Sequence, residues 1–224
     1  MTDNHRGNTY GVMGLVLLCC VIMALVETIL EPAYAVKSAI KVVVFLLLPL
    51  LFARAAGIKR FNPMLVPDKK HILPLLALGC LVYVVILGAY ALTKSIFDYA
   101  ALVQSLSADQ NVAPASFVWV ALYISFGNSF LEEFLFRFVS FLKLSDYTNR
   151  KTAYRFSAIA FAVYHIAMIG TAFPPLLLVL SLIGLTVGGY LFDYVDETGG
   201  TFYYSWIIHM FADFAIMTIW YLHI

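Results

Sequence analysis

The chain has 224 residues, of which 62% are hydrophobic and 12% charged, and its formal net charge is +1. A soluble domain usually contains about 45–50% apolar and about 25% charged residues, so this composition, with a mean hydropathy of +0.90, indicates an integral membrane protein. The near-neutral charge gives no reason to expect a nucleic-acid partner. The three cysteines lie inside apolar runs and offer neither a disulfide framework nor a metal-binding spacing.

Hydropathy predicts an all-α helical bundle of about seven transmembrane helices in a single membrane domain, residues 1–224. The expected spans lie at residues 10–30, 36–56, 71–94, 117–142, 152–170, 174–193 and 201–222. The first span is interpreted as a retained helix and not as a signal peptide. Between the third and fourth spans, residues 95–116 are expected to form a short interfacial helix followed by a turn at Pro114.

Basic residues in the short loops predict the orientation in the membrane. Lysine and arginine gather after the second and after the fourth expected span, and loops of this kind usually face the cytoplasm. We therefore expect a protein of the plasma (inner) membrane with its N-terminus in the cytoplasm. An acidic loop containing Asp193, Asp196 and Glu197 would also be cytoplasmic and departs from the pattern.

The fourth span, residues 117–142, carries charged residues near its middle. A single charge at the bilayer centre costs about 2.5–3.5 kcal/mol on insertion scales, so these residues need partners. Glu133 and Arg137 are four residues apart with the acid first, and they are expected to pair along one helix face in a structural role. Glu132 points about 100° away from Glu133, on a polar stripe that includes Asn128, and a chemical role is favoured for it.

Three further polar residues are expected at a comparable depth, and they come from the fifth and seventh spans. Glu132 lies about 16 Å, His165 about 20 Å and His209 about 12 Å from the expected cytoplasmic edge, at about 1.5 Å per residue. Asp213 is one helical turn from His209 on the same face. These side chains are therefore predicted to meet in one layer of the bilayer, biased toward the cytoplasmic side.

Such a layer suits the hydrolysis of an acyl bond, most naturally a peptide bond. A glutamate with a histidine partner can activate a water molecule, and a second histidine can stabilise an oxyanion. Zinc is the competing interpretation, because Glu132, His165, His209 and Asp213 are all acceptable ligands, but the short His-Glu-x-x-His motif is absent. A proton pathway is disfavoured because the two halves of the chain show no inverted repeat.

Three motifs resemble those of the CPBP family, the CAAX-protease and bacteriocin-processing intramembrane proteases also called Abi. They are EEFLFR at residues 132–137, FAVYH at residues 161–165 and HMFAD at residues 209–213, which resemble EExxxR, FxxxH and HxxxN/D. The motifs occur in the family's order and each lies inside a hydrophobic span. The resemblance covers about residues 115–220, which we expect to be the catalytic core, whereas the first three spans resemble only generic membrane helices.

The resemblance implies an all-helical intramembrane endopeptidase that needs no cofactor, with a zinc-dependent mechanism as the alternative. Glu132 and His165 would activate the attacking water, and His209 with Asp213 would line the oxyanion site. The prenyl-protein proteases of the family carry asparagine at the last position. An ionised Asp213 would repel a developing negative charge, so it would have to be protonated or only orient His209.

The resemblance also implies the roles of other residues and the partners. A structural or substrate-binding role is expected for Glu133, Arg137, Phe161 and Asn128. The partners would be membrane lipid and a peptide or protein substrate with a cleavage site near the membrane, such as a lipidated tail, a leader or a sorting tail. A non-proteolytic membrane scaffold of the same family remains the alternative function.

Overall fold

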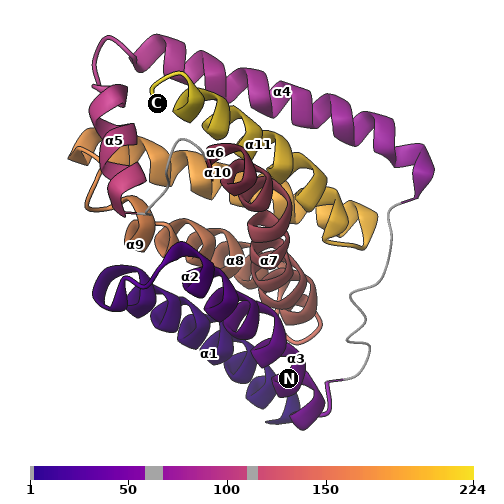
Figure 1. The fold of residues 1–224 in the computed structure, drawn as a ribbon. Coiled ribbons are helices and arrows are strands. Elements are labelled where there is room, and N and C mark those ends of the chain that lie inside the picture. The colour runs from indigo at the N-terminus through magenta and orange to yellow at the C-terminus, as the bar shows by residue number, and fades with distance from the viewer. Residues whose placement is uncertain (1–2, 59–67, 110–115) are drawn as a thin grey trace.

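The computed structural model describes residues 3–58, 68–109 and 116–224, and all regular elements in these ranges are helical (Figure 1). The predicted all-α membrane bundle is confirmed. Five helices are long and apolar enough to cross a membrane: Arg6–Leu30, Tyr34–Ala55, Lys70–Thr93, Arg150–Ile169 and Pro175–Gly199. The other two expected spans are also helical but are not among these five, and each of them carries some of the polar residues of the candidate site.

An N-terminal helical hairpin forms one side of the bundle, drawn in indigo and violet in Figure 1. It consists of α1 (Asp3–Leu25), η1 (Val26–Leu30), α2 (Tyr34–Val42), η2 (Val43–Leu47) and α3 (Leu48–Ala55), where η marks a wider π-helical stretch. The first arm ends at Glu31, whose left-handed backbone (φ 41°) allows the chain to turn back. Two lysines of α2, Lys37 and Lys41, are buried inside the protein.

Helix α4 (Lys69–Thr93) begins at Asp68, whose side chain accepts a hydrogen bond from Lys70 N at 3.1 Å, as N-cap residues do. It lies along the C-terminal helix α11 (Tyr203–Tyr221). Hydrogen bonds join the two helices toward both ends, from His71 to Tyr204 (2.6 Å) and from Tyr90 to His223 (2.9 Å) just beyond α11.

The connection between α4 and the central helix contains α5 (Tyr99–Asp109), which confirms the expected short helix at this place. The expected turn at Pro114 lies outside the described residues.

The central helix is continuous from Phe117 to Lys143 and carries the charged motif. Its parts are α6 (Phe117–Leu122), η4 (Tyr123–Asn128), α7 (Ser129–Glu133) and η5 (Phe134–Lys143). π-helical turns lie on both sides of the single α-helical turn that holds Glu132 and Glu133. Wide turns of this type are frequent at functional sites and change the direction in which side chains point.

Three helices complete the bundle: α8 (Arg150–Tyr164), its short continuation α9 (Ile166–Ile169) and α10 (Pro175–Gly199). Asn149 caps the start of α8 by accepting from Thr152 N at 2.9 Å. The α8–α9 rod is interrupted at His165. Helix α10 ends at Gly200, whose φ of 69° is the left-handed conformation that glycine adopts without strain.

Helices α8 and α10 pack closely at one glycine. An added Cβ at Gly189 would lie 2.9 Å from Ala158 Cα, so only glycine fits between the two backbones. At Gly188, one residue earlier, a Cβ would have no heavy atom within 4 Å. The two positions therefore differ sharply in what a methyl group would meet.

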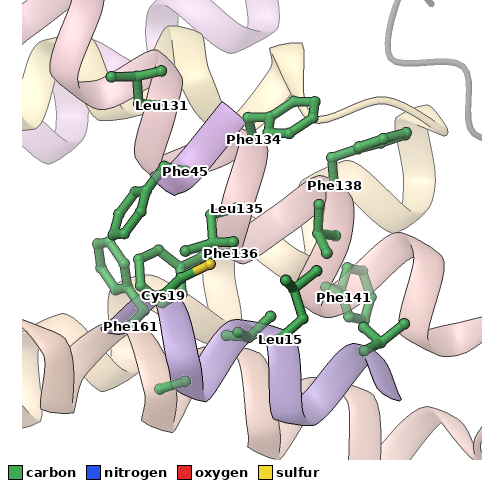
Figure 2. Close-up of a cluster of buried hydrophobic side chains, with 14 of the residues drawn as sticks. Leu15, Cys19, Phe45, Leu131, Phe134, Leu135, Phe136, Phe138, Phe141 and Phe161 are labelled. Atoms are coloured by element: carbon green, nitrogen blue, oxygen red, sulfur yellow. The ribbon is translucent and has the colours of Figure 1, made fainter. Parts of the chain in front are cut away.

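The main hydrophobic core fixes the central helix against α1, η2 and α8 (Figure 2). Aromatic rings dominate it, and edge-to-face pairs such as Phe45 with Phe136 (5.8 Å) and Phe136 with Phe161 (5.4 Å) contribute beyond their buried area. The fully buried members include Phe45, Phe134, Phe136 and Phe141. This packing fixes the position of η5, which directly follows Glu133.

The prediction of an acidic loop that contains Asp193, Asp196 and Glu197 is wrong, because helix α10 continues to Gly199. Asp193 and Asp196 are completely buried, and Glu197 pairs with Arg150 of α8 at 2.6 Å. Charged side chains end a hydropathic run in the sequence, but here each of the three has a partner on a neighbouring helix. The departure from the basic-loop pattern therefore disappears.

Candidate active site

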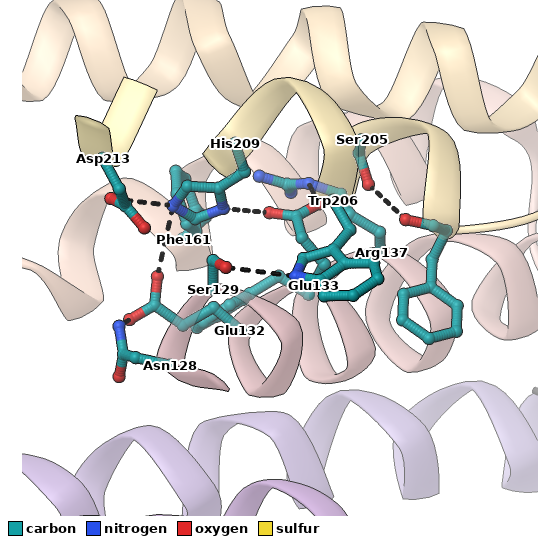
Figure 3. A network of polar contacts seen from close by, with 12 residues as sticks. Asn128, Ser129, Glu132, Glu133, Arg137, Phe161, Ser205, Trp206, His209 and Asp213 are labelled. Atoms are coloured by element: carbon teal, nitrogen blue, oxygen red, sulfur yellow. Dashed lines mark hydrogen bonds and ion pairs between the residues drawn. The ribbon is translucent and has the colours of Figure 1, made fainter. Parts of the chain in front are cut away.

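Four sequence-predicted residues meet where α7, the end of α8 and α11 approach one another. Figure 3 labels three of them, Glu132, Glu133 and His209. Glu132 and Glu133 are neighbours on α7 and point in different directions, as their helical spacing requires. His165 lies at the α8–α9 junction, and His209 lies in the middle of α11. Both glutamates are essentially unexposed, so each needs partners inside the protein.

The two oxygens of the Glu132 carboxylate have different surroundings. Oε1 accepts hydrogen bonds from Lys41 Nζ at 2.6 Å and from Asn128 Nδ2 at 3.0 Å. Oε2 faces the Nε2 atoms of His165 and His209, at 3.8 Å from each. This separation is too long for a direct hydrogen bond.

His165 has a defined tautomer in its neutral form. Its Nδ1 lies 2.7 Å from the carbonyl oxygen of Phe161, which can only accept, so Nδ1 carries the proton. Nε2, the atom that faces Glu132, then has a free lone pair. Phe161, one turn earlier on α8, therefore orients the imidazole through its backbone as well as packing against it at a ring distance of 4.7 Å.

His209 is held by Glu133, a contact that the sequence did not predict. Its Nδ1 lies 2.7 Å from Glu133 Oε1 and donates to this carboxylate. The carboxylate fixes the ring so that Nε2 points toward Glu132, as partners of functional histidines commonly do. The two consecutive glutamates of the motif therefore face different nitrogen atoms of His209: Glu133 contacts Nδ1, and Glu132 faces Nε2.

Asp213 lies beside His209 on α11. Its Oδ1 is 3.6 Å from His209 Nε2, and the residue is buried. The carboxyl group therefore shares the space in front of Nε2 with Glu132. The predicted proximity of Asp213 to His209 is seen, and Figure 3 marks the contact with a dashed line.

Glu133 and Arg137 form the ion pair expected from their spacing, with Oε2 and Nε 3.3 Å apart and both side chains fully buried. The geometry is not that of a hydrogen bond, so the attraction is electrostatic. Arg137 Nη1 donates to Ser157 Oγ at 2.8 Å and reaches Asp193 Oδ1 at 3.5 Å. Its guanidinium carbon also lies 4.5 Å from the ring centroid of Phe161, a cation–π contact.

Two contacts place α11 relative to the rest of the site. The carboxylate of Asp196 accepts from Ser205 N at 2.8 Å in the first turn of α11, where backbone N–H groups lack helical partners and negative charge is favourable. Trp206 donates its indole N–H to Ser129 Oγ of α7 at 3.1 Å. Helix α11 is therefore fixed both to α10 and to α7 within one turn of His209.

Residues 114–215 match the family described as Type II CAAX prenyl endopeptidase Rce1-like. Over these residues, which are less than half of the chain, the protein is similar to this family. The expected resemblance to the CPBP proteases is thereby confirmed over this segment, and the match supports a CAAX-type intramembrane endopeptidase in general terms. Comparison with curated proteins and with solved structures gives no match.

The Rce1-like segment does not contain the whole polar cluster. The sequence interpretation named three polar groups at the depth of Glu132, which is wrong because Lys41 of α2 and Asp193 of α10 also reach the cluster. Lys41 lies outside the matched residues. A signal was present, since two lysines four residues apart inside an apolar span carry the same insertion cost as the glutamates.

Glu132, His165, His209 and Asp213 are the residues at this site that could act as zinc ligands. A zinc site needs three or four ligands at about 2.0–2.3 Å. In the part of the chain that the structure describes, no group of three or more His, Cys, Asp or Glu side chains is arranged to hold a metal ion. Lys41 would also place its ammonium next to the dication, since it is bonded to Glu132.

Proposed function

We propose that the protein hydrolyses a peptide bond close to the membrane in a membrane-associated substrate, such as a lipidated tail, a leader or a sorting tail. The observation that carries the proposal is the position of Glu132 Oε2, which faces the Nε2 atoms of His165 and His209 at 3.8 Å each. A carboxylate and two imidazoles around one small volume are the groups that water activation and oxyanion stabilisation require.

In the proposed reaction, a water bound between Glu132 Oε2 and His165 Nε2 attacks the carbonyl carbon of the peptide. Glu132 takes the proton of this water as the new C–O bond forms. His209, when it carries a proton on Nε2, donates to the resulting oxyanion. The C–N bond then breaks, and the proton held by Glu132 passes to the departing amine.

The surrounding carboxyl groups support this division of roles. Glu133 binds Nδ1 of His209 and orients it, so the expected structural residue Glu133 also takes part in positioning. Asp213 faces the same Nε2 atom at 3.6 Å. A charged Asp213 would oppose an oxyanion there, and we therefore assign it an orienting role toward His209 in place of direct oxyanion binding.

A metal-free mechanism is part of the proposal. It is supported by the lysine bonded to Glu132, because an ammonium next to the carboxylate competes with a dication for the same negative charge. General base catalysis of this type contributes about 10²–10⁴-fold to the rate, so loss of the Glu132 carboxylate should cost at least that range.

The test is cleavage of fluorogenic peptides by the purified protein in detergent, using a farnesylated CAAX peptide and an unmodified leader peptide as probes. We expect cleavage of at least one probe by the wild type, and a fall of about 10²-fold or more in kcat for Glu132→Gln. Glu27→Gln is the matched control, since Glu27 is also bonded to a buried lysine, Lys37. Cleavage by Glu132→Gln at the wild-type rate would refute the proposal, and binding without cleavage by the wild type would favour the scaffold function.

A further inference from the structure

Lys41 is a buried lysine that joins the N-terminal hairpin to the catalytic cluster. It comes from α2, outside residues 114–215 that match the protease family. Its Nζ lies 2.6 Å from Glu132 Oε1 and 2.5 Å from Asn128 Oδ1. A lysine is placed at such depth only at considerable cost, so the contact is expected to serve the function of the site.

The position of the ammonium group is tightly defined. Nζ lies 5.1 Å from the ring centroid of Phe45 and 5.2 Å from that of Tyr164, within the range of cation–π attraction. Both aromatic residues belong to the main hydrophobic core. Lys41 therefore has little freedom to follow Glu132 if the carboxylate turns.

The contacts of the Glu132 carboxylate are divided between its oxygens. Both side-chain donors, Lys41 and Asn128, go to Oε1, and Asn128 is itself held by the same lysine. Oε2 is turned toward the two imidazoles. A partial rotation of the carboxylate would lengthen both hydrogen bonds to Oε1 and would turn Oε2 away from the imidazoles.

We propose that Lys41 is a positioning residue of the proposed peptidase reaction, and this inference rests on that proposed function. It fixes Glu132 Oε1, with Asn128, so that Oε2 faces His165 and His209. The N-terminal hairpin thereby contributes to catalysis although it lies outside the family match. Lys41 does not touch the reacting atoms and acts through Glu132.

A second lysine on the same helix provides a matched control. Lys37 lies one turn before Lys41 and forms an ion pair with Glu27, with Nζ and Oε2 2.9 Å apart and with 9% of the Glu27 side chain exposed. The side-chain exposure of Lys37 and of Lys41 is 6% in each case. Removing either ammonium takes the cation away from a largely buried carboxylate, so both changes should destabilise the protein.

The experiment compares Lys41→Met, Lys41→Gln and Lys41→Arg with Lys37→Met in the farnesylated-peptide assay, per folded molecule. We expect Lys41→Met to lower kcat by about 10–100-fold, as second-shell changes do, with KM within about twofold. Lys41→Arg, which keeps a cationic donor, should recover most of the loss. Lys37→Met should keep kcat and KM near the wild-type values.

A spectroscopic measurement decides the question independently of activity. The chain has five histidines, so the ¹⁵N signals of their rings can be assigned in the labelled protein. We expect the His165 and His209 signals to change in Lys41→Met and to stay in Lys37→Met. These changes would support the positioning role even if no probe is cleaved, in which case only the proposed function fails.

Several results would overturn the inference. One is a folded Lys41→Met or Lys41→Gln protein with kcat within about twofold of the wild type. Another is parallel loss of folding and kcat in the Lys41 and Lys37 variants, with the same histidine signals in both. Failure of both neutral Lys41 variants to fold, when Lys37→Met folds, would assign Lys41 a purely structural role.

Discussion

Replacement of Arg137 by methionine tests the role of the buried ion pair. The change removes the cation that faces Glu133 Oε2 at 3.3 Å and Asp193 Oδ1 at 3.5 Å, while all these side chains are fully buried. Breaking one side of a buried pair costs about 3–5 kcal/mol, because the remaining charge has no partner. For a chain of this length, each kcal/mol lowers the melting temperature by about 2–4 °C, so a fall of about 6–20 °C is expected.

The assay is thermal unfolding of the purified protein in one fixed detergent, followed by tryptophan fluorescence and by loss of the monodisperse peak. Arg150→Met is the control, since Arg150 binds Glu197 with 65% of its side chain exposed and should change the melting temperature little. Adding Asp193→Asn to Arg137→Met removes one of the stranded carboxylates and should restore part of the loss.

The reasoning is refuted if Arg137→Met shifts the melting temperature by less than about 2 °C, the effect of under 1 kcal/mol. If cleavage is absent in such a stable variant, Arg137 belongs with the residues that contact substrate or the reacting groups. A large fall that the Asp193→Asn change does not lessen would mean that the lost contact with Phe161 outweighs the ion pairs.

Three further changes have defined outcomes. Glu133→Gln should lower kcat by about 10–100-fold through His209, whose Nδ1 loses its carboxylate, and an unchanged kcat would show that Glu133 is only structural. Gly189→Ala should lower the melting temperature because the methyl group meets Ala158, whereas Gly188→Ala should not. The same melting temperature in both variants would contradict the close packing of α8 and α10. Prolonged chelation should leave cleavage intact, and activity lost to a chelator and restored by zinc alone would overturn the metal-free mechanism.

Much of the fold and the convergence of three site residues could be predicted from the sequence. Long apolar runs mark membrane helices, because backbone groups in lipid must bond within the helix. Polar groups at equal depth on different spans must share an interior environment, and this reasoning predicted that Glu132, His165 and His209 lie together. Spacing on one helix was also sufficient for the pair of Glu133 with Arg137.

Contacts between helices could not be predicted in the same way. Whether Glu133 meets His209 depends on how α7 and α11 are rotated about their axes, and the π-helical turns beside α7 change that rotation. Asp193 looked like a loop residue because its charge ends an apolar run. Its partners on η5 and α8 are far away in the chain, so the sequence did not reveal them. Lys41 was overlooked because its span matches no motif, although its charge alone required a buried partner.

Because α4 packs closely along α11, the thickness of the bilayer around α4 bears on the position of α11. The candidate membrane span of α4, Lys70–Thr93, has 24 residues, and only 11% of its most apolar window is buried inside the protein. At 1.5 Å per residue it measures about 36 Å, longer than a hydrocarbon core of about 30 Å. Such a helix accommodates the mismatch by tilting, and α4 is tied to α11 by His71 and Tyr204. We therefore expect lipids of different acyl length to change the tilt of α4 and, through this contact, the position of α11, which carries His209.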